Sequence, residues 1–243
     1  MLNSSAPESP AGTPCEQTIP FSRRRQAIAR RLTLSAQTIP HFYLSLDVDM
    51  ASAAAWRRTL NDERCLHITV TDLVAKVTAL ALRQFPRLNA HVGDDSITLK
   101  PNINLGIAVA ADEGLLVPVI PNADRLGLVE LSECSGRNSA AARKGRMTSA
   151  AIGTFTVSSL GMYGVKHFLP IINPPECAIL AVGLAEPRVV PVLEGVAVRP
   201  VMTLTLACDH RAVDGAEAAQ FLSAVKEGLE DAPSFLSEWA PRA

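Results

Sequence analysis

One loop near the C-terminal end of the chain combines an imidazole with a carboxylate. His210 precedes Asp214 by four residues in the sequence CDHRAVDG, residues 208–215. Apolar and hydroxyl side chains alternate over residues 201–207, which predicts a half-buried strand, and apolar residues at helical spacing follow Gly215. His210 would therefore lie at the mouth of a strand with a carboxylate nearby, which is a common way to hold a general base. A structural histidine at a strand end is the alternative that the loop alone leaves open.

A second candidate is Ser158, which ends the strand predicted over residues 153–158. A glycine-bearing turn, SSLG, follows from residue 158 to residue 161. A hydroxyl in this position can donate a hydrogen bond into a pocket, as the donors that stabilise an oxyanion do. A serine that caps the turn is the alternative. No GxSxG elbow surrounds the residue, which argues against a serine hydrolase.

Composition narrows the class of protein. The 243 residues are 48% hydrophobic and 19% charged, and a net charge of −1 gives no reason to expect nucleic acid or a membrane as partner. Five cysteines without a CxxC pair argue against a disulfide framework and a zinc site, and favour a reducing compartment. No HxxxH or HExxH spacing occurs, so we expect no metal centre. Since no membrane span or signal-peptide core is visible, we expect a soluble cytoplasmic protein.

The order of the predicted elements indicates one α+β domain. Residues 1–18 are rich in Ser, Pro, Ala and Gly and are expected to form a flexible, linker-like arm before a domain over 19–243. Helices are predicted over 20–38, 51–61, 69–85, 128–144 and beyond 215, and strands over 42–50, 96–100, 104–110, 115–120, 153–158, 178–183, 188–193 and 201–207. Helices and strands mix without strict βαβ alternation, which favours a mixed or antiparallel sheet flanked by helices.

Arginines crowd the first predicted helix. They are Arg23, Arg24, Arg25, Arg30 and Arg31. Such a run is usually a solvated face, but the guanidinium fork also binds phosphates and carboxylates through two parallel hydrogen bonds.

Seven pieces of the sequence, taken in order, resemble the catalytic domain of the dihydrolipoamide acyltransferases, the E2 core components of 2-oxoacid dehydrogenase complexes. They are RQAIARRL (25–32), TIPHF (38–42), GIAV (106–109), GLLVPV (114–119), GTFTVSSLGMYG (153–164), INPP (172–175) and DHRAVDG (209–215). The similarity covers residues 19–236. Chloramphenicol acetyltransferases share the fold and a similar His-x-x-x-Asp-Gly loop, but usually carry a histidine in place of Asp209. The resemblance implies a chloramphenicol acetyltransferase-like fold, with a mixed sheet flanked by helices in a single domain.

The resemblance also implies a reaction. The family moves an acyl group between dihydrolipoamide and coenzyme A without an acyl-enzyme intermediate. By its motif, His210 is the general base on the thiol, Ser158 supplies the hydrogen bond to the oxyanion, and Asp214 is the carboxylate that holds the loop. A free thiol has a pKa of ~8.5 and is mostly protonated at neutral pH, so a base within hydrogen-bond reach speeds its attack.

Two arginines are candidates for binding by the same resemblance. Arg25 is the residue we expect to pair with Asp214, by analogy with the related acetyltransferases. Arg57, after Trp56, stands where the family places an arginine on coenzyme A, and its neighbour Arg58 is the alternative.

The family's assemblies supply expectations about partners. The resemblance implies a homotrimer in which His210 of one chain faces Ser158 of the next, and such trimers often build cores of 24 or 60 subunits. The lipoyl group, and the contacts to the E1 and E3 components, belong to N-terminal domains absent from this chain. The sequence is therefore either an isolated catalytic core or a naturally short protein that takes its lipoyl arm in trans.

Acetyl is the expected acyl group, because residues 160–164, LGMYG, look like those of acetyl-specific members. Branched-chain acyl and succinyl groups are alternatives. Two further alternatives are a coenzyme A-dependent acetyltransferase acting on a small molecule and a non-catalytic structural core subunit. The presence of His210, Asp214 and Ser158 together argues against the structural subunit.

Overall fold

A six-stranded mixed sheet organises the chain in the computed structural model, which describes residues 16–111 and 114–240. Its order is β1-β10-β9-β8-β4-β7. The strands are β1 (His41–Asp49), β4 (Leu105–Ile107), β7 (Val119–Ile120), β8 (Phe155–Ser159), β9 (Ala178–Val192) and β10 (Gly195–Asp209). β8 runs parallel to both of its neighbours, while the other pairs are antiparallel. The predicted mixed sheet is confirmed.

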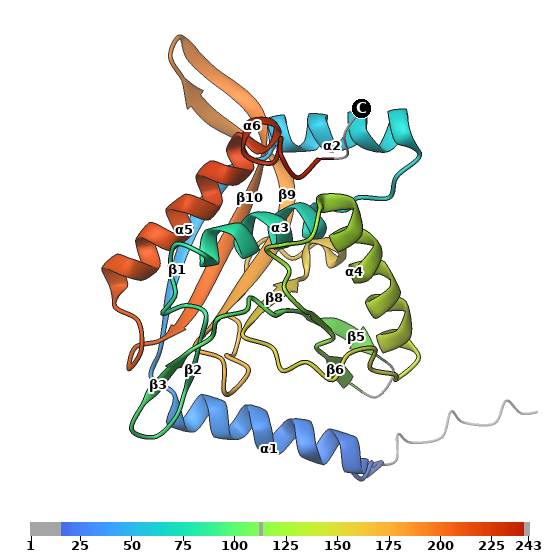
Figure 1. Ribbon diagram of the computed structural model, residues 1–243, viewed down its shortest axis with the longest axis vertical. Helices are drawn as coiled ribbons and strands as arrows, with labels where there is room; N and C mark the ends of the chain where they lie inside the picture. Colours follow the sequence, from blue (N-terminus) through green and yellow to red (C-terminus); the bar gives the residue numbers. More distant parts are fainter. Residues whose placement is uncertain (1–15, 112–113, 241–243) are drawn as a thin grey trace, which may run out of the picture.

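Helices surround the sheet. They are α1 (Arg23–Thr38), α2 (Ala51–Arg64), α3 (Val70–Leu82), α4 (Leu128–Arg143), α5 (Gly215–Glu230) and the short α6 (Ala232–Phe235), with a 3-10 turn, η1 (Gly161–Tyr163). Figure 1 shows α5 alongside β1, α3 crossing the middle of the sheet, and α1 lying apart from them near the end where β1 begins. The predicted α+β architecture with flanking helices is therefore correct.

Helix α3 forms the centre of the hydrophobic core. Every residue from Asp72 to Leu82 is buried, so the helix is enclosed all round rather than amphipathic. Its start is fixed by a capping box, in which the Thr69 hydroxyl accepts from the Asp72 N–H (3.1 Å) and the Asp72 carboxylate accepts from the Thr69 N–H (2.9 Å). Phe221 of α5 contacts Phe155 of β8, with 5.7 Å between ring centroids, and joins this helix layer to the sheet.

The β9–β10 hairpin is longer than the sequence suggested. We predicted separate strands over 178–183 and 188–193, but β9 is continuous over 15 residues and pairs with β10 throughout, apart from one register shift. The strand contains Pro187 and Pro191, and proline cannot donate to a ladder. In the outer half of the hairpin both prolines lie in a two-stranded arm, which Figure 1 shows projecting beyond the sheet. The missing N–H donor of proline is tolerated there because none of the described strands pairs with that edge of β9.

Two further predicted strands are divided. The apolar run 115–120 splits into β6 (Gly114–Leu116) and β7 around Pro118, and 104–110 splits into β4 and β5 (Val109–Ala111). β5 pairs with β6, and β2 (Ala90–Val92) pairs with β3 (Ile97–Leu99). The sequence DEG at 112–114 predicts a turn, but residues 112–113 and most of the arm expected over 1–18 lie outside the described residues. Within the described ranges, no helix has the length and apolarity to cross a membrane.

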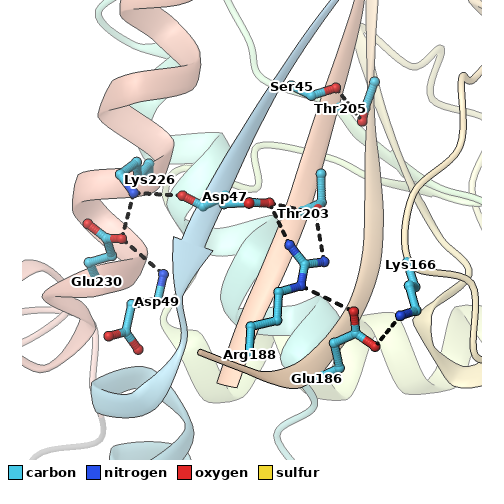
Figure 2. Close-up of polar contacts among 10 residues, drawn as sticks. All are labelled: Ser45, Asp47, Asp49, Lys166, Glu186, Arg188, Thr203, Thr205, Lys226 and Glu230. Carbon is cyan, nitrogen blue, oxygen red and sulfur yellow. Dashed lines mark hydrogen bonds and ion pairs between the residues drawn. The ribbon is translucent and has the colours of Figure 1, made fainter. Parts of the chain in front are cut away.

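A polar network ties the base of the β9–β10 arm to its neighbours (Figure 2). Arg188 of β9 donates to Asp47 of β1 (3.0 Å), to Thr203 of β10 (3.1 Å) and to Glu186 (3.1 Å). Thr203 donates to the same Asp47 oxygen (2.6 Å), and Glu186 pairs with Lys166 (3.0 Å). The network therefore links three strands to the segment that follows β8.

Candidate active site

The loop that carries His210 turns sharply as β10 ends. Asp209 is the last residue of the strand and is fully buried, and its N–H donates to the Cys177 carbonyl (2.8 Å). Its own carbonyl accepts from the N–H groups of Ala212 (3.0 Å) and Val213 (3.1 Å). These bonds fold the chain back on itself, so that His210 stands at the outside of the turn.

His210 itself is exposed and is fixed mainly through its backbone. Its N–H donates to the Pro40 carbonyl (3.1 Å), and its ring lies against Phe42, with 4.6 Å between centroids and 51° between planes. Among the described residues, neither ring nitrogen has a hydrogen-bond partner. The imidazole is thus accessible to a ligand, in the strand-end position that the sequence predicted.

Asp214 is the N-cap residue of α5. Its backbone is extended (φ −86°, ψ 158°), and its carbonyl accepts from the Ala218 N–H (3.0 Å), but its side chain makes no capping hydrogen bond. The expected pairing with Arg25 does not occur within one chain. Arg25 lies in the first turn of α1, where its guanidinium packs against Gly114 of β6. The carboxylate of Asp214 has no partner in the part of the chain that the structure describes.

Ser158 lies in β8 and lines a cavity of about 310 Å³. Its other walls combine hydroxyl-bearing and imidazole side chains with apolar ones, among them Ser132, Ser135, Ser139, His67, Thr69, Tyr163, Ile107, Val109, Leu160 and Met162. Many of these walls are hydroxyl groups, which both donate and accept hydrogen bonds. The cavity therefore suits a ligand that presents apolar groups as well as amides and hydroxyls along its length.

Asp72 fixes two walls of this cavity. Its carboxylate, only 3% exposed, accepts from the Thr69 hydroxyl (2.8 Å) and from the Ser132 hydroxyl (3.0 Å). A buried carboxylate with several donors is held firmly, because each bond offsets part of its desolvation. The start of α3 and the first turns of α4 are therefore locked together beside Ser158.

Arg57 braces the segment that leads into the cavity wall. One of its terminal nitrogens donates to the Ile68 carbonyl (3.0 Å), which also accepts from Asn61 (3.0 Å). Its Nε is buried and has no partner among the described residues. Arg57 does not line the cavity, but His67 and Thr69 on the braced segment do. Arg58 is exposed, and contact of either arginine with coenzyme A stays a prediction.

The register of the sheet separates Ser158 from His210. Ser158 pairs with Ala181, and Ala181 pairs with Thr205, so these three residues share one row across β8, β9 and β10. His210 follows Asp209, four residues beyond Thr205 on β10. A strand rises ~3.3 Å per residue, and neighbouring strands lie ~4.8 Å apart. The backbone positions of Ser158 and His210 are therefore separated by more than ~15 Å. One chain does not bring the two side chains together.

Sequence reasoning missed the serine wall of α4 and the partner of Asp209. Ser132, Ser135 and Ser139 stand at spacings of three and four, which places them on one face of the helix predicted over 128–144. That spacing was the signal from which a polar face of this helix could have been predicted. The buried Asp209 binds Arg211 two positions on, and a pair at this spacing in a loop carries no periodic signal.

Two other histidines and the cysteines have structural surroundings. His41 bridges the Ile39 carbonyl and the Ile172 N–H, and His91 Nε2 lies 2.7 Å from the Gly153 carbonyl. Burial lowers the pKa of His91. The four cysteines within the described ranges are free, and burial raises the pKa of Cys177 to about 12, which leaves its thiol unreactive. No cluster of metal ligands occurs in the described residues.

Comparison with solved structures first identifies the fold. A chloramphenicol acetyltransferase superposes with a TM-score of 0.54 over 88% of this chain and 99% of its own at 15% identity, a likeness of fold alone. Much greater similarity links the chain to one family. Residues 13–237 match the model of the 2-oxoacid dehydrogenases acyltransferase catalytic domain. The chain therefore belongs to this family.

Individual relatives agree with this assignment. The dihydrolipoyllysine-residue acetyltransferase component of the Rickettsia bellii pyruvate dehydrogenase complex is 39% identical over 217 residues, covering 87% of this chain and 52% of that protein. The chain thus spans about half the length of that relative. A structure from a study of a serine, a histidine and an asparagine in the catalytic mechanism of Azotobacter vinelandii dihydrolipoamide acetyltransferase is 30% identical, with a TM-score of 0.86 over 93% of this chain and 99% of its own. The cubic core of a pyruvate dehydrogenase multienzyme complex gives 29% identity, a TM-score of 0.86 and the same coverage.

Proposed function

We propose that this chain transfers an acetyl group between dihydrolipoamide and coenzyme A, as the catalytic core of a pyruvate dehydrogenase-type complex. One observation carries the assignment of residues. In the Azotobacter enzyme the histidine follows the studied serine by 52 positions and precedes the asparagine by four. In this chain, His210 follows Ser158 by 52 positions and precedes Asp214 by four. The agreement in both spacings supports the same roles here, with an aspartate in the third position.

The chemistry follows from the groups present. His210 takes the proton of the attacking thiol, and the thiolate adds to the thioester carbonyl. The carbonyl oxygen becomes an oxyanion, to which the Ser158 hydroxyl donates a hydrogen bond. The tetrahedral intermediate then collapses, the carbon–sulfur bond to the original thiol breaks, and that sulfur recovers the proton from the imidazolium of His210. The Asp214 carboxylate has no partner within the described part of one chain; it moves no proton in this scheme, and its role in holding the loop stays a prediction.

The Ser158 cavity is the proposed binding site for the pantetheine arm of coenzyme A. That arm carries two amides and a hydroxyl, which match the serine and threonine hydroxyls of the walls. Arg143, at the C-terminal end of α4, also lines the cavity and provides a cation for the phosphates. Arg57 and Arg58 are the further candidates for this role.

A second copy of the chain completes the proposed site. Because Ser158 and His210 of one chain are more than ~15 Å apart, the intermediate needs His210 of one subunit and Ser158 of its neighbour. A homotrimer supplies this arrangement three times, and the cubic core of the similar complex supports a larger assembly. Cores of 24 or 60 subunits are the candidates. The lipoyl group, and contacts to E1 and E3, are proposed to come from domains other than this catalytic domain. The free thiols of the described cysteines favour a reducing environment, which supports a cytoplasmic location.

An acyl-transfer assay tests the proposal. Purified protein receives acetyl-, isobutyryl- or succinyl-coenzyme A together with free dihydrolipoamide, and thioester exchange is followed for each donor. We expect acetyl to be preferred. His210→Ala should reduce turnover by ~10²–10⁴-fold without changing the oligomer, while the control His167→Ala, at an exposed position, should not. Absence of transfer with every donor would refute the function, and an active His210→Ala variant would refute the assigned base.

A further inference from the structure

The two residues that flank His210 bind each other across it. Arg211 donates from Nε to both Asp209 oxygens (3.0 and 3.2 Å) and from a terminal nitrogen to the second (2.7 Å). The backbone N–H of Arg211 also donates to Asp209 (3.0 Å). The Asp209 carboxylate thus accepts four hydrogen bonds from the residue two positions on, which closes a ring around the backbone of His210.

The burial of Asp209 makes this pairing strong and directional. Its side chain is fully buried, and a buried carboxylate is stable only when it is paired and hydrogen-bonded. The fork of the guanidinium fixes the geometry of the pair more tightly than a single bond would. The same hydrogen bonds raise the pKa of Arg211. Since Asp209 is also bonded to Cys177 of the segment before β9, the pair anchors the loop to the sheet.

The imidazole depends on this anchor for its direction. In a catalytic triad a third group holds the histidine ring by a hydrogen bond. In the described part of this chain, the ring nitrogens of His210 have no such partner, and the ring only rests against Phe42. The direction of the ring is therefore set by the backbone on either side of His210, which Pro40 holds at its N–H and the Asp209–Arg211 pair holds across the turn.

We propose that Asp209 and Arg211 are positioning residues, whose mutual ion pair aims the imidazole of His210 at the thiol. The inference rests on the proposed function, because it explains the orientation of His210, the general base that this function requires. A base displaced by even a small distance loses much of its effect, because proton transfer needs hydrogen-bond contact.

A neutral double substitution tests the pair without leaving a buried charge. In Asp209→Asn/Arg211→Gln both charges are removed, so the buried position keeps no charge without a partner, whereas loss of Arg211 alone would leave one. We expect an intact oligomer, a kcat per assembled trimer ~10–100-fold lower, and KM values for both thiol substrates within about twofold. Arg211→Lys keeps the charge and one bond, and should recover part of the lost kcat. Arg137→Ala removes an exposed pair with Glu133 and is the control.

The outcomes separate three cases. A purely structural role would lower the melting temperature and the yield of trimer, but leave kcat per trimer unchanged, and this result overturns the inference. If the double variant does not fold, Arg211→Lys decides, and a kcat equal to that of the unaltered protein overturns the inference. If His210→Ala stays active, the proposed base is wrong, whatever the flanking residues do.

Discussion

Ser158 and His210 lie at different levels of one sheet, because Ser158 shares a row with Thr205 while His210 comes after the end of the same strand. The side chain that would remove the thiol proton and the side chain that would stabilise the oxyanion are therefore apart in a single chain. The active unit implied by the proposed chemistry contains at least two chains. Because of this separation, one chain forms the Ser158 cavity, but His210 of the same chain does not reach that cavity.

Substitution of Ser158 tests the oxyanion role. Ser158→Ala should lower kcat by ~10²–10³-fold, because one preorganised donor to the developing charge is lost. The KM for acyl-coenzyme A should change little. Ser139→Ala removes a hydroxyl of α4 from the same cavity and should reduce kcat by less than ~3-fold, since no role in stabilising the developing charge is assigned to it. Equal losses in both variants would mean that Ser158 only shapes the cavity.

Arg57 and Arg58 can be separated by measuring stability and coenzyme A binding together. Arg57→Ala removes a donor to Ile68 and should lower the free energy of unfolding by ~1–3 kcal/mol. It should also raise the KM for coenzyme A, because the braced segment carries His67 and Thr69 of the cavity wall. Arg58→Ala should leave stability unchanged. A higher KM in Arg58→Ala alone would assign the coenzyme A contact to Arg58.

Glu176 should make stability depend on pH. Its carboxyl accepts from Thr156 (2.6 Å) and Asn173 (3.0 Å), but burial raises its pKa from 4.5 to about 7. A raised pKa stabilises the fold fully below pH 4.5, and this contribution is lost as pH rises through 7. The unaltered protein should therefore lose up to ~3 kcal/mol relative to Glu176→Gln between these pH values.

Urea unfolding at pH 5, 6, 7 and 8, at one protein concentration, measures this difference. Glu133→Gln, at an exposed position, is the control and should follow the unaltered protein at every pH. A constant gap between Glu176→Gln and the unaltered protein would show that Glu176 does not titrate in this range.

Local patterns predicted much of the fold, and long-range geometry could not be predicted from them. The alternation over 42–50 and the cap at Thr69 each determined an element, and both elements occur as predicted within a few residues. The strands predicted over 178–183 and 188–193 are one strand, because pairing with β10 continues through residues 185–187.

The sequence predicted which residues belong to the candidate site, but not how far apart they lie. His210 and Ser158 were found from their strand ends, but their separation follows from strand order and register, which no local pattern encodes. For the same reason the expected pairing of Arg25 with Asp214 could not be tested by sequence, and one chain does not form it.

Subunit complementation tests the shared active site most directly. Ser158→Ala and His210→Ala variants are each prepared, then unfolded, mixed in equal amounts and refolded together, with each variant refolded alone as the control. In a randomly mixed trimer, about a quarter of the interfaces combine an intact His210 with an intact Ser158 from the neighbouring chain. The account predicts that the mixture regains about a quarter of the activity of the unaltered protein, while each variant alone stays nearly inactive. A mixed assembly, verified by sedimentation, that is no more active than the separate variants would contradict it.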